Sequence, residues 1–176
     1  SDTPFELGII RNHYVGRTFI EPTQTIRAFS VKLKHNANRI LVDKKRVILI
    51  DDSIVRGTTS IKIVQMMREA GATEVHMRIA APPIRHPDFY GIDTPVQDQL
   101  LAANNSLEEM CDFIGADSLA FLTVDGLYKA MGHKNGRDND NPAYTDHCFT
   151  GDYPTQLQDQ KNDEKIQQLS LLSERR

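Results

Sequence analysis

The stretch that decides the fold is RVILIDDSIVRGTT, residues 46–59. It begins with the apolar run Val47–Ile50, which is typical of a parallel strand buried on both faces. Asp51 and Asp52 follow at once, at the carboxyl end of the strand, where open α/β sheets bind ligands. A turn rich in hydroxyl groups then leads into a helical pattern that ends at Gly71. The stretch therefore predicts a strand, a turn and a helix, with a ligand site at the turn.

This turn has the composition of a sugar-phosphate site. The amino terminus of a helix offers unpaired N–H groups to a phosphate, Gly57 lets the backbone approach it, and Thr58 and Thr59 add hydroxyl donors. Asp51 and Asp52 would repel a phosphate, but they suit sugar hydroxyls or a Mg²⁺ ion that bridges to phosphate oxygens. The alternative is an ordinary strand-to-helix turn with a capping threonine and two solvated carboxylates.

Four further blocks accompany the turn: IIRNHYVGRTFIEPTQTIR (9–27), REAGATEVHMRIAAPPIRHPDFYGIDTP (68–95), IGADSL (114–119) and CFTGDYP (148–154). With them, residues 4–155 resemble the type I phosphoribosyltransferases, and among these the glutamine phosphoribosylpyrophosphate (PRPP) amidotransferase family. The resemblance implies an α/β fold with a parallel sheet flanked by helices, as an incomplete domain. Residues 1–155 would be the carboxyl-terminal portion of the phosphoribosyltransferase domain, and residues 156–176 a polar tail, partly helical or disordered. The amino-terminal glutaminase domain would lie outside this chain.

The resemblance also implies an activity. Such enzymes transfer ammonia from glutamine to PRPP, giving 5-phosphoribosylamine, pyrophosphate and glutamate, the first committed step of de novo purine synthesis. The basic stretch 11–34 matches the family's loop that closes over PRPP. The implied catalytic residues are Arg11, Tyr14, Arg17 and Lys34. The implied PRPP-binding residues are Asp51, Asp52, Ser53, Ile54, Val55, Arg56, Gly57, Thr58 and Thr59, with Asp51 and Asp52 also orienting Mg²⁺.

Other functions remain open from the residues alone. A phosphoribosyltransferase that uses a purine base would share the same loop. A non-catalytic, PRPP-binding regulatory or structural fragment is a further alternative, and we expect this chain alone to be inactive.

Composition narrows the class of protein. The chain has 176 residues, a net charge of −3 and 39% hydrophobic residues, as expected for one globular domain. It contains no apolar run of membrane-spanning length and no series of aromatic residues of the kind that stacks on nucleic acid. Two cysteines do not make a disulfide framework, which favours the cytoplasm. We expect no membrane or nucleic-acid partner, and a homodimer or homotetramer.

Some members of the resembled family bind an iron–sulfur cluster through four cysteines. In this chain Asp88, Pro142 and Thr145 stand at three of the corresponding positions. Cys111 and Cys148 cannot supply four ligands, so no cluster is expected.

A second metal pattern lies near the end of the chain. His133, Asp146, His147 and Cys148 are potential ligands, although their spacing matches no standard metal motif.

The remaining elements follow from local signals. Thr94 and Pro95 would begin a helix through Leu101, Ser106 and Glu109 form a capping-box pattern, and Thr123 would cap a last helix. The other predicted elements are strands over 5–10, 74–81 and 118–122 and a helix over 30–41.

Overall fold

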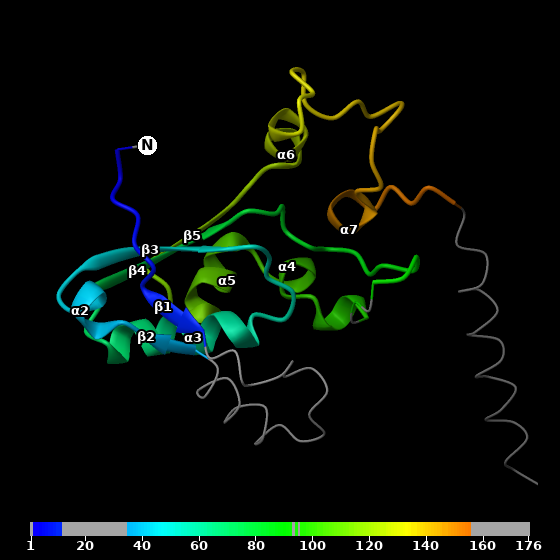
Figure 1. Ribbon diagram of the computed structural model, residues 1–176. Helices are drawn as coiled ribbons and strands as arrows, with labels where there is room; N and C mark the ends of the chain where they lie inside the picture. Colours follow the sequence, from blue (N-terminus) through cyan, green and yellow to red (C-terminus); the bar gives the residue numbers. More distant parts are fainter. Residues whose placement is uncertain (1, 12–34, 93, 95, 156–176) are drawn as a thin grey trace, which may run out of the picture.

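The structure, a computed structural model, describes residues 2–11, 35–92, 94 and 96–155 (Figure 1). Its central elements are β3 (Arg46–Asp51), α3 (Thr58–Glu69), β4 (Glu74–Ile79), α5 (Leu107–Ile114) and β5 (Ser118–Phe121). The three strands form a parallel sheet in the order β3-β4-β5. Parallel neighbours need a crossover connection, and α3 and α5 lie in these two crossovers. The predicted α/β class, with a parallel sheet flanked by helices, is confirmed.

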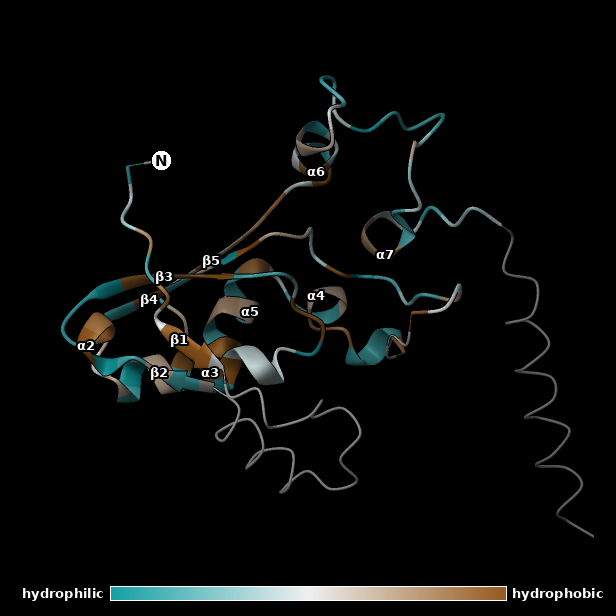
Figure 2. Ribbon diagram, viewed as in Figure 1, coloured by the Kyte–Doolittle hydropathy of each residue, from teal (hydrophilic) through white to brown (hydrophobic). Residues whose placement is uncertain are grey.

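Both crossover helices cover the same face of the sheet (Figure 1). This follows from the strand order, because two right-handed crossovers that advance in one direction place their helices on one side. The hydrophobic core lies between this face and the helices, and Figure 2 shows hydrophobic residues on both layers. Its fully buried members include Val64, Met67, Val75, Met77, Ile79, Met110 and Ile114.

The other face of the sheet is open in the described structure. Ile48 and Ile50 of β3 are 53% and 73% exposed, whereas Val47 and Leu49 are half-buried and pack against the core. The prediction that Val47–Ile50 is buried on both faces is therefore wrong for the described structure. The strand alternates because helices cover only one of its faces.

Two local helix signals are confirmed at atomic detail. The Ser106 hydroxyl accepts a hydrogen bond from the Glu109 N–H, and the Glu109 carboxylate accepts one from the Ser106 N–H. Thr123 accepts from the Gly126 N–H at the start of α6 (Val124–Ala130). The helix predicted to end before Gly115 does so, with the glycine at φ +73°.

The amino-terminal predictions are only partly correct. A two-stranded antiparallel sheet pairs β1 (Ile9–Arg11) with β2 (His35–Ala37), and α2 (Arg39–Val42) follows. The strand predicted over 5–10 is thus shorter, and Phe5 and Leu7 are exposed. Part of the helix predicted over 30–41 is instead β2, because pairing with the distant β1 satisfies its backbone. The predictions for residues 12–34 and 156–176 fall outside the described residues.

After β4 the chain forms short helical turns. The helix predicted through Leu101 is divided into η2 (Gln97–Gln99) and α4 (Leu101–Asn104). Among the helices of the described residues, none has the length and apolar character needed to cross a membrane.

A buried ion-pair network, which the sequence did not reveal, holds the region after α6. Arg137 Nε donates to Asp146 at 2.6 Å, and its Nη2 donates to Asp152 at 2.6 Å. Tyr128 of α6 also donates its hydroxyl to Asp146, at 2.8 Å. Burial opposes the charge of Asp146, but Arg137 and Tyr128 outweigh it, so its pKa lies below the ordinary value. The network positions α7 (His147–Thr150), which begins at the next residue.

Candidate functional site

The candidate site begins where β3 ends. Asp51 is the last residue of the strand, and one of its carboxylate oxygens accepts a hydrogen bond from the Asp52 N–H at 3.0 Å. Asp52 in turn accepts from the Ser53 N–H at 2.6 Å. Asp52 is exposed, while Asp51 and Ser53 are half-buried. Asp51 and Asp52 therefore stand at the carboxyl end of β3, and each carboxylate accepts a hydrogen bond from the N–H group of the next residue.

The loop that follows, residues 53–57, is held in place by contacts with neighbouring segments. The Ile54 side chain is buried in the core, and the Val55 carbonyl accepts a hydrogen bond from the Leu101 N–H at 2.9 Å. The Arg56 guanidinium donates to the Gln99 side-chain oxygen at 3.0 and 3.2 Å. Ile54 and Val55 thus anchor the loop, and any contact that they make with a ligand would come from their backbone atoms.

Gly57 forms the tight turn into α3. It has φ +76°, in the left-handed region that favours glycine, and it is buried against Leu101 and Phe113. Thr58 and Thr59 are exposed at the first turn of the helix. The Thr58 and Thr59 side chains and the first N–H groups of the helix therefore belong to the same exposed turn.

The start of α3 differs from those of α5 and α6. Ser106 and Thr123 cap those two helices, whereas no side chain of the described residues caps α3. The first N–H groups of an α-helix have no partner within the helix, and they carry the positive end of its dipole. A 12-residue helix with an open amino terminus beside a glycine turn is suited to an anion.

The other predicted site residues cannot be placed with these. Arg11 is the last residue of β1, and only its backbone is described. Tyr14, Arg17 and Lys34 lie outside the described residues.

The four potential metal ligands near the end of the chain, whose spacing matches no standard motif, have different contacts in the structure. Asp146 is held by Arg137, and His133 lies 3.3 Å from the Tyr144 hydroxyl. His147 and Cys148 instead face Asp88, a residue that only the family resemblance had singled out. His133 and Asp146 thus have other partners than His147 and Cys148.

Asp88 is bonded on both carboxylate oxygens. Oδ1 lies 2.7 Å from Nε2 of His147, and Oδ2 accepts from the N–H groups of Tyr90 at 3.0 Å and Ile92 at 2.6 Å. Burial alone would raise the pKa of Asp88, but these two N–H groups and His147 outweigh it, so the pKa lies below the ordinary value. In Cys148, burial and then the Asp88 charge raise the pKa of the thiol.

Solved structures of known proteins have a similar fold and sequence to this chain. The solved structure of glutamine PRPP amidotransferase from Bacillus subtilis, complexed with ADP and GMP, matches with a TM-score of 0.74 and 55% identity, covering 88% of this chain and 33% of that one. A second structure, described as the allosteric regulatory enzyme of purine biosynthesis, matches with a TM-score of 0.73 and 54% identity, again over 88% and 33%. No family model matches the chain.

Curated relatives give the same picture. The amidophosphoribosyltransferase of Rhizobium etli is 63% identical over 174 residues, which cover 98% of this chain and 35% of the relative. That of Bacillus subtilis is 55% identical over 154 residues, which cover 88% and 32%. The chain thus spans about a third of the length of the curated relatives it matches.

The fold and the loop define a domain of the type I phosphoribosyltransferase class. More narrowly, the chain belongs to the amidophosphoribosyltransferase family, and it corresponds to the carboxyl-terminal phosphoribosyltransferase part of its relatives.

Proposed function

We propose that this chain is the PRPP-binding part of an enzyme that transfers glutamine-derived ammonia to PRPP. One observation carries the proposal: the uncapped amino terminus of α3 is joined to Asp51 and Asp52 at the end of β3 by the short loop of residues 53–57. A phosphate-binding group thereby lies close to groups that bind sugar hydroxyls. The names of the relatives support the same reaction.

Each part of the loop has a distinct role in this proposal. The backbone N–H groups over 56–59, with the Thr58 and Thr59 hydroxyls, hold the 5′-phosphate. Asp51 and Asp52 accept hydrogen bonds from the two ribose hydroxyls. The C–O bond between the anomeric carbon and pyrophosphate breaks through an oxocarbenium-like transition state, and ammonia attacks that carbon. The carboxylates stabilise the positive charge that develops there.

Mg²⁺ fits the donor set at the end of β3, because it prefers carboxylate oxygens and Asp51 and Asp52 are consecutive acids there. Asp51 and Asp52 would hold it, and it would neutralise charge on the pyrophosphate as this group leaves. Arg11, Tyr14, Arg17 and Lys34 are proposed to approach the pyrophosphate from the closing loop. Support for these four residues comes from the family resemblance alone.

The wider assignment is part of the same proposal. Residues 1–155 form the phosphoribosyltransferase portion, residues 156–176 a separate tail, and a glutaminase domain of the same enzyme delivers ammonia. We further propose that the protein is cytoplasmic, which the free thiols of Cys111 and Cys148 support. We also propose that it forms a homodimer or homotetramer and has no membrane or nucleic-acid partners.

The test is ammonia-dependent turnover of the full-length enzyme. Asp51→Asn and Asp52→Asn each remove one carboxylate charge and should lower turnover at least tenfold, whereas the exposed Asp112→Asn on α5 should not. Near-normal turnover in both loop variants would overturn the site assignment. Consumption of a purine base in place of ammonia would favour a base-specific transferase, and saturable PRPP binding without turnover would favour a regulatory protein.

A further inference from the structure

A second cluster of reactive side chains lies outside the loop of residues 51–59. Asp88, His147 and Cys148 each bring a potential ligand atom to one place, and these atoms all lie within 4.8 Å of one another. The Asp88 and His147 side chains are 2% and 5% exposed, and Cys148 is partly buried. The cluster joins two segments that are 59 residues apart in the chain.

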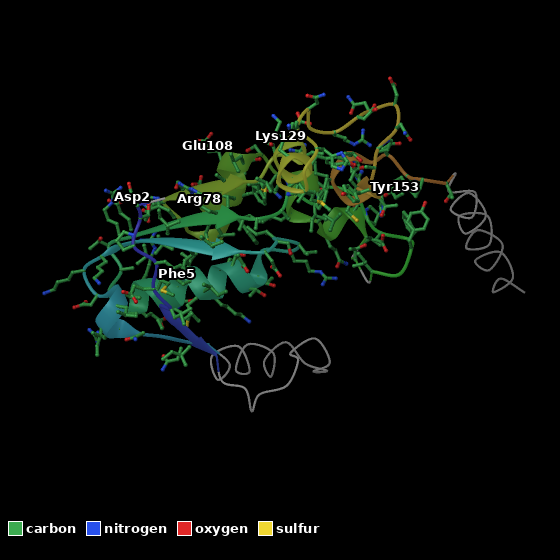
Figure 3. All side chains as sticks on the ribbon, turned by 45° about the horizontal axis from the view of Figure 1, so that its top comes forward. Asp2, Phe5, Arg78, Glu108, Lys129 and Tyr153 are labelled. Atoms are coloured by element: carbon green, nitrogen blue, oxygen red, sulfur yellow. The ribbon has the colours of Figure 1, made fainter. Side chains whose placement is uncertain are left out.

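The surrounding structure fixes all three residues. Oδ2 of Asp88 is held by two backbone N–H groups, which leaves Oδ1 facing His147. The Cys148 carbonyl accepts from the N–H groups of Arg85 at 2.9 Å and His86 at 3.1 Å, which fastens α7 to the segment 85–92. Figure 3 shows Tyr153 beside this segment, where its hydroxyl donates to the Pro87 carbonyl at 2.8 Å.

The His147 ring contains an unexplained nitrogen. Because the Asp88 carboxylate can only accept, Nε2 carries the proton between them when no ion is bound. Within the described part of the chain, Nδ1 is the one buried side-chain nitrogen or oxygen without a hydrogen-bond partner. An unsatisfied buried polar atom destabilises the folded state. The rings of Tyr90 and Tyr153 pack on His147, with centroids 5.1 and 5.0 Å from its own, and help to hold it in place.

We infer that Asp88, His147 and Cys148 form a binding site for one divalent transition-metal ion of the zinc type. Imidazole and thiolate are the ligands that zinc prefers, whereas Mg²⁺ and Ca²⁺ favour oxygen donors. Zinc binds histidine nitrogen at about 2.0 Å and cysteine sulfur at about 2.3 Å, so its ligand atoms lie about 3.5 Å apart. The three ligand atoms lie within 4.8 Å of one another, so they would draw together when the ion binds.

Charge balance supports a divalent ion at this buried position. On binding, the S–H bond of Cys148 breaks, sulfur forms a bond to the metal, and the proton leaves to solvent. A carboxylate, a thiolate and a neutral imidazole then offset the two positive charges of the ion. The ion would replace the hydrogen bond between Nε2 of His147 and Oδ1 of Asp88, with the ring proton passing to Nδ1, and it would cross-link α7 to the segment 85–92.

The experiment uses the full-length protein, purified without chelator and then titrated with Co²⁺ as a spectroscopic substitute for zinc. We expect one equivalent of bound metal by elemental analysis, a thiolate-to-cobalt charge-transfer band and tetrahedral d–d bands. Cys148→Ser should abolish the charge-transfer band, and Asp88→Asn should weaken binding at least tenfold. Cys111→Ser, which changes the other cysteine, should leave the spectrum and the affinity unchanged.

Thermal unfolding provides a second readout. Zinc should raise the melting temperature of the parent protein and of Cys111→Ser, but not that of Cys148→Ser. If Cys148→Ser does not fold, the Asp88→Asn affinity and the charge-transfer band decide. Failure of the parent protein to bind one equivalent, or a cobalt spectrum that Cys148→Ser or Asp88→Asn does not alter, overturns the site. The Asp88–His147 hydrogen bond would then be the whole connection between the two segments.

Discussion

Gly57 lies so close to Phe113 that a Cβ placed on the glycine would stand 3.0 Å from Cε1 of the ring. The same Cβ would lie 2.8 Å from Cδ2 of Leu101. The turn into α3 is therefore shaped by α4 and α5, neither of which contributes a predicted ligand group. Leu101 and Phe113, which lie far from the loop in the sequence, thus constrain the conformation of the proposed phosphate loop.

We predict that Gly57→Ala lowers both stability and PRPP affinity. The left-handed conformation costs a non-glycine residue about 1–2 kcal/mol, and overpacking against Phe113 and Leu101 adds about 1–3 kcal/mol. Gly115→Ala is the matched control, because Gly115 has φ +73° and no atom within 4 Å of its added Cβ. Urea unfolding should show the larger loss for Gly57→Ala. Equal losses would mean that the packing at the turn contributes nothing.

The contact between Arg56 and Gln99 should matter for substrate binding. Gln99→Ala removes the acceptor for both guanidinium hydrogen bonds, each spanning at most 3.2 Å. If these bonds hold the loop equally in the free enzyme and in the transition state, KM for PRPP should rise about three- to tenfold with little change in kcat. Gln97→Ala, at the start of η2, keeps the backbone carbonyl that Asn104 contacts and should behave normally. A fall in kcat without a change in KM would contradict this role.

The parts of the fold that sequence predicted correctly depend on local physics. Ser106 and Glu109 can satisfy each other's backbone only at the first turn of a helix, and Gly115 tolerates the left-handed cap. The turn at Gly57 could be predicted for the same reason, since its glycine and hydroxyl residues lie next to each other in the chain. The identity of the proposed ligand came from the family resemblance.

The parts that sequence missed depend on contacts between distant residues. A continuous apolar run such as Val47–Ile50 contains no alternation, so it cannot reveal that the partner layers cover only one face. The short strand β2 forms only because β1 lies beside it. Asp88 and His147 are 59 residues apart in the sequence and are brought together only by the fold. No periodic pattern in the sequence could therefore have predicted their hydrogen bond.

The pair of Arg137 and Asp146 should be important for stability. Their side chains are 8% and 4% exposed, so Arg137→Met would leave a buried carboxylate without its main partner. We expect a loss of about 3–5 kcal/mol in the free energy of unfolding. The control is Arg46→Met, which breaks an ion pair of the same 2.6 Å length to Glu74, with side chains 72% and 40% exposed. That change should cost at most about 1 kcal/mol, and similar losses for the two variants would refute the role of burial.

Acid should lower the free energy of unfolding by protonating the Asp117 carboxylate. The Val75 N–H donates to its carboxylate at 2.6 Å and Arg68 donates to the same oxygen at 2.9 Å. The Val75 bond outweighs burial and, with Arg68, holds the pKa of Asp117 below its ordinary value of 3.8. The unfolded chain therefore binds a proton more readily than the folded one near that pH. Stability from this group is present above pH 3.8 and is lost as the pH falls further.

Asp117→Asn tests this dependence, because the amide can still accept from Val75 but carries no charge. Urea unfolding between pH 3 and pH 7 should show a deficit relative to the parent that is largest at neutral pH and shrinks in acid. Arg68→Met leaves the bond from Val75 in place and should retain most of the parent's pH dependence. A deficit for Asp117→Asn that stays constant from pH 7 to pH 3 would show that the carboxylate stabilises the fold without its charge.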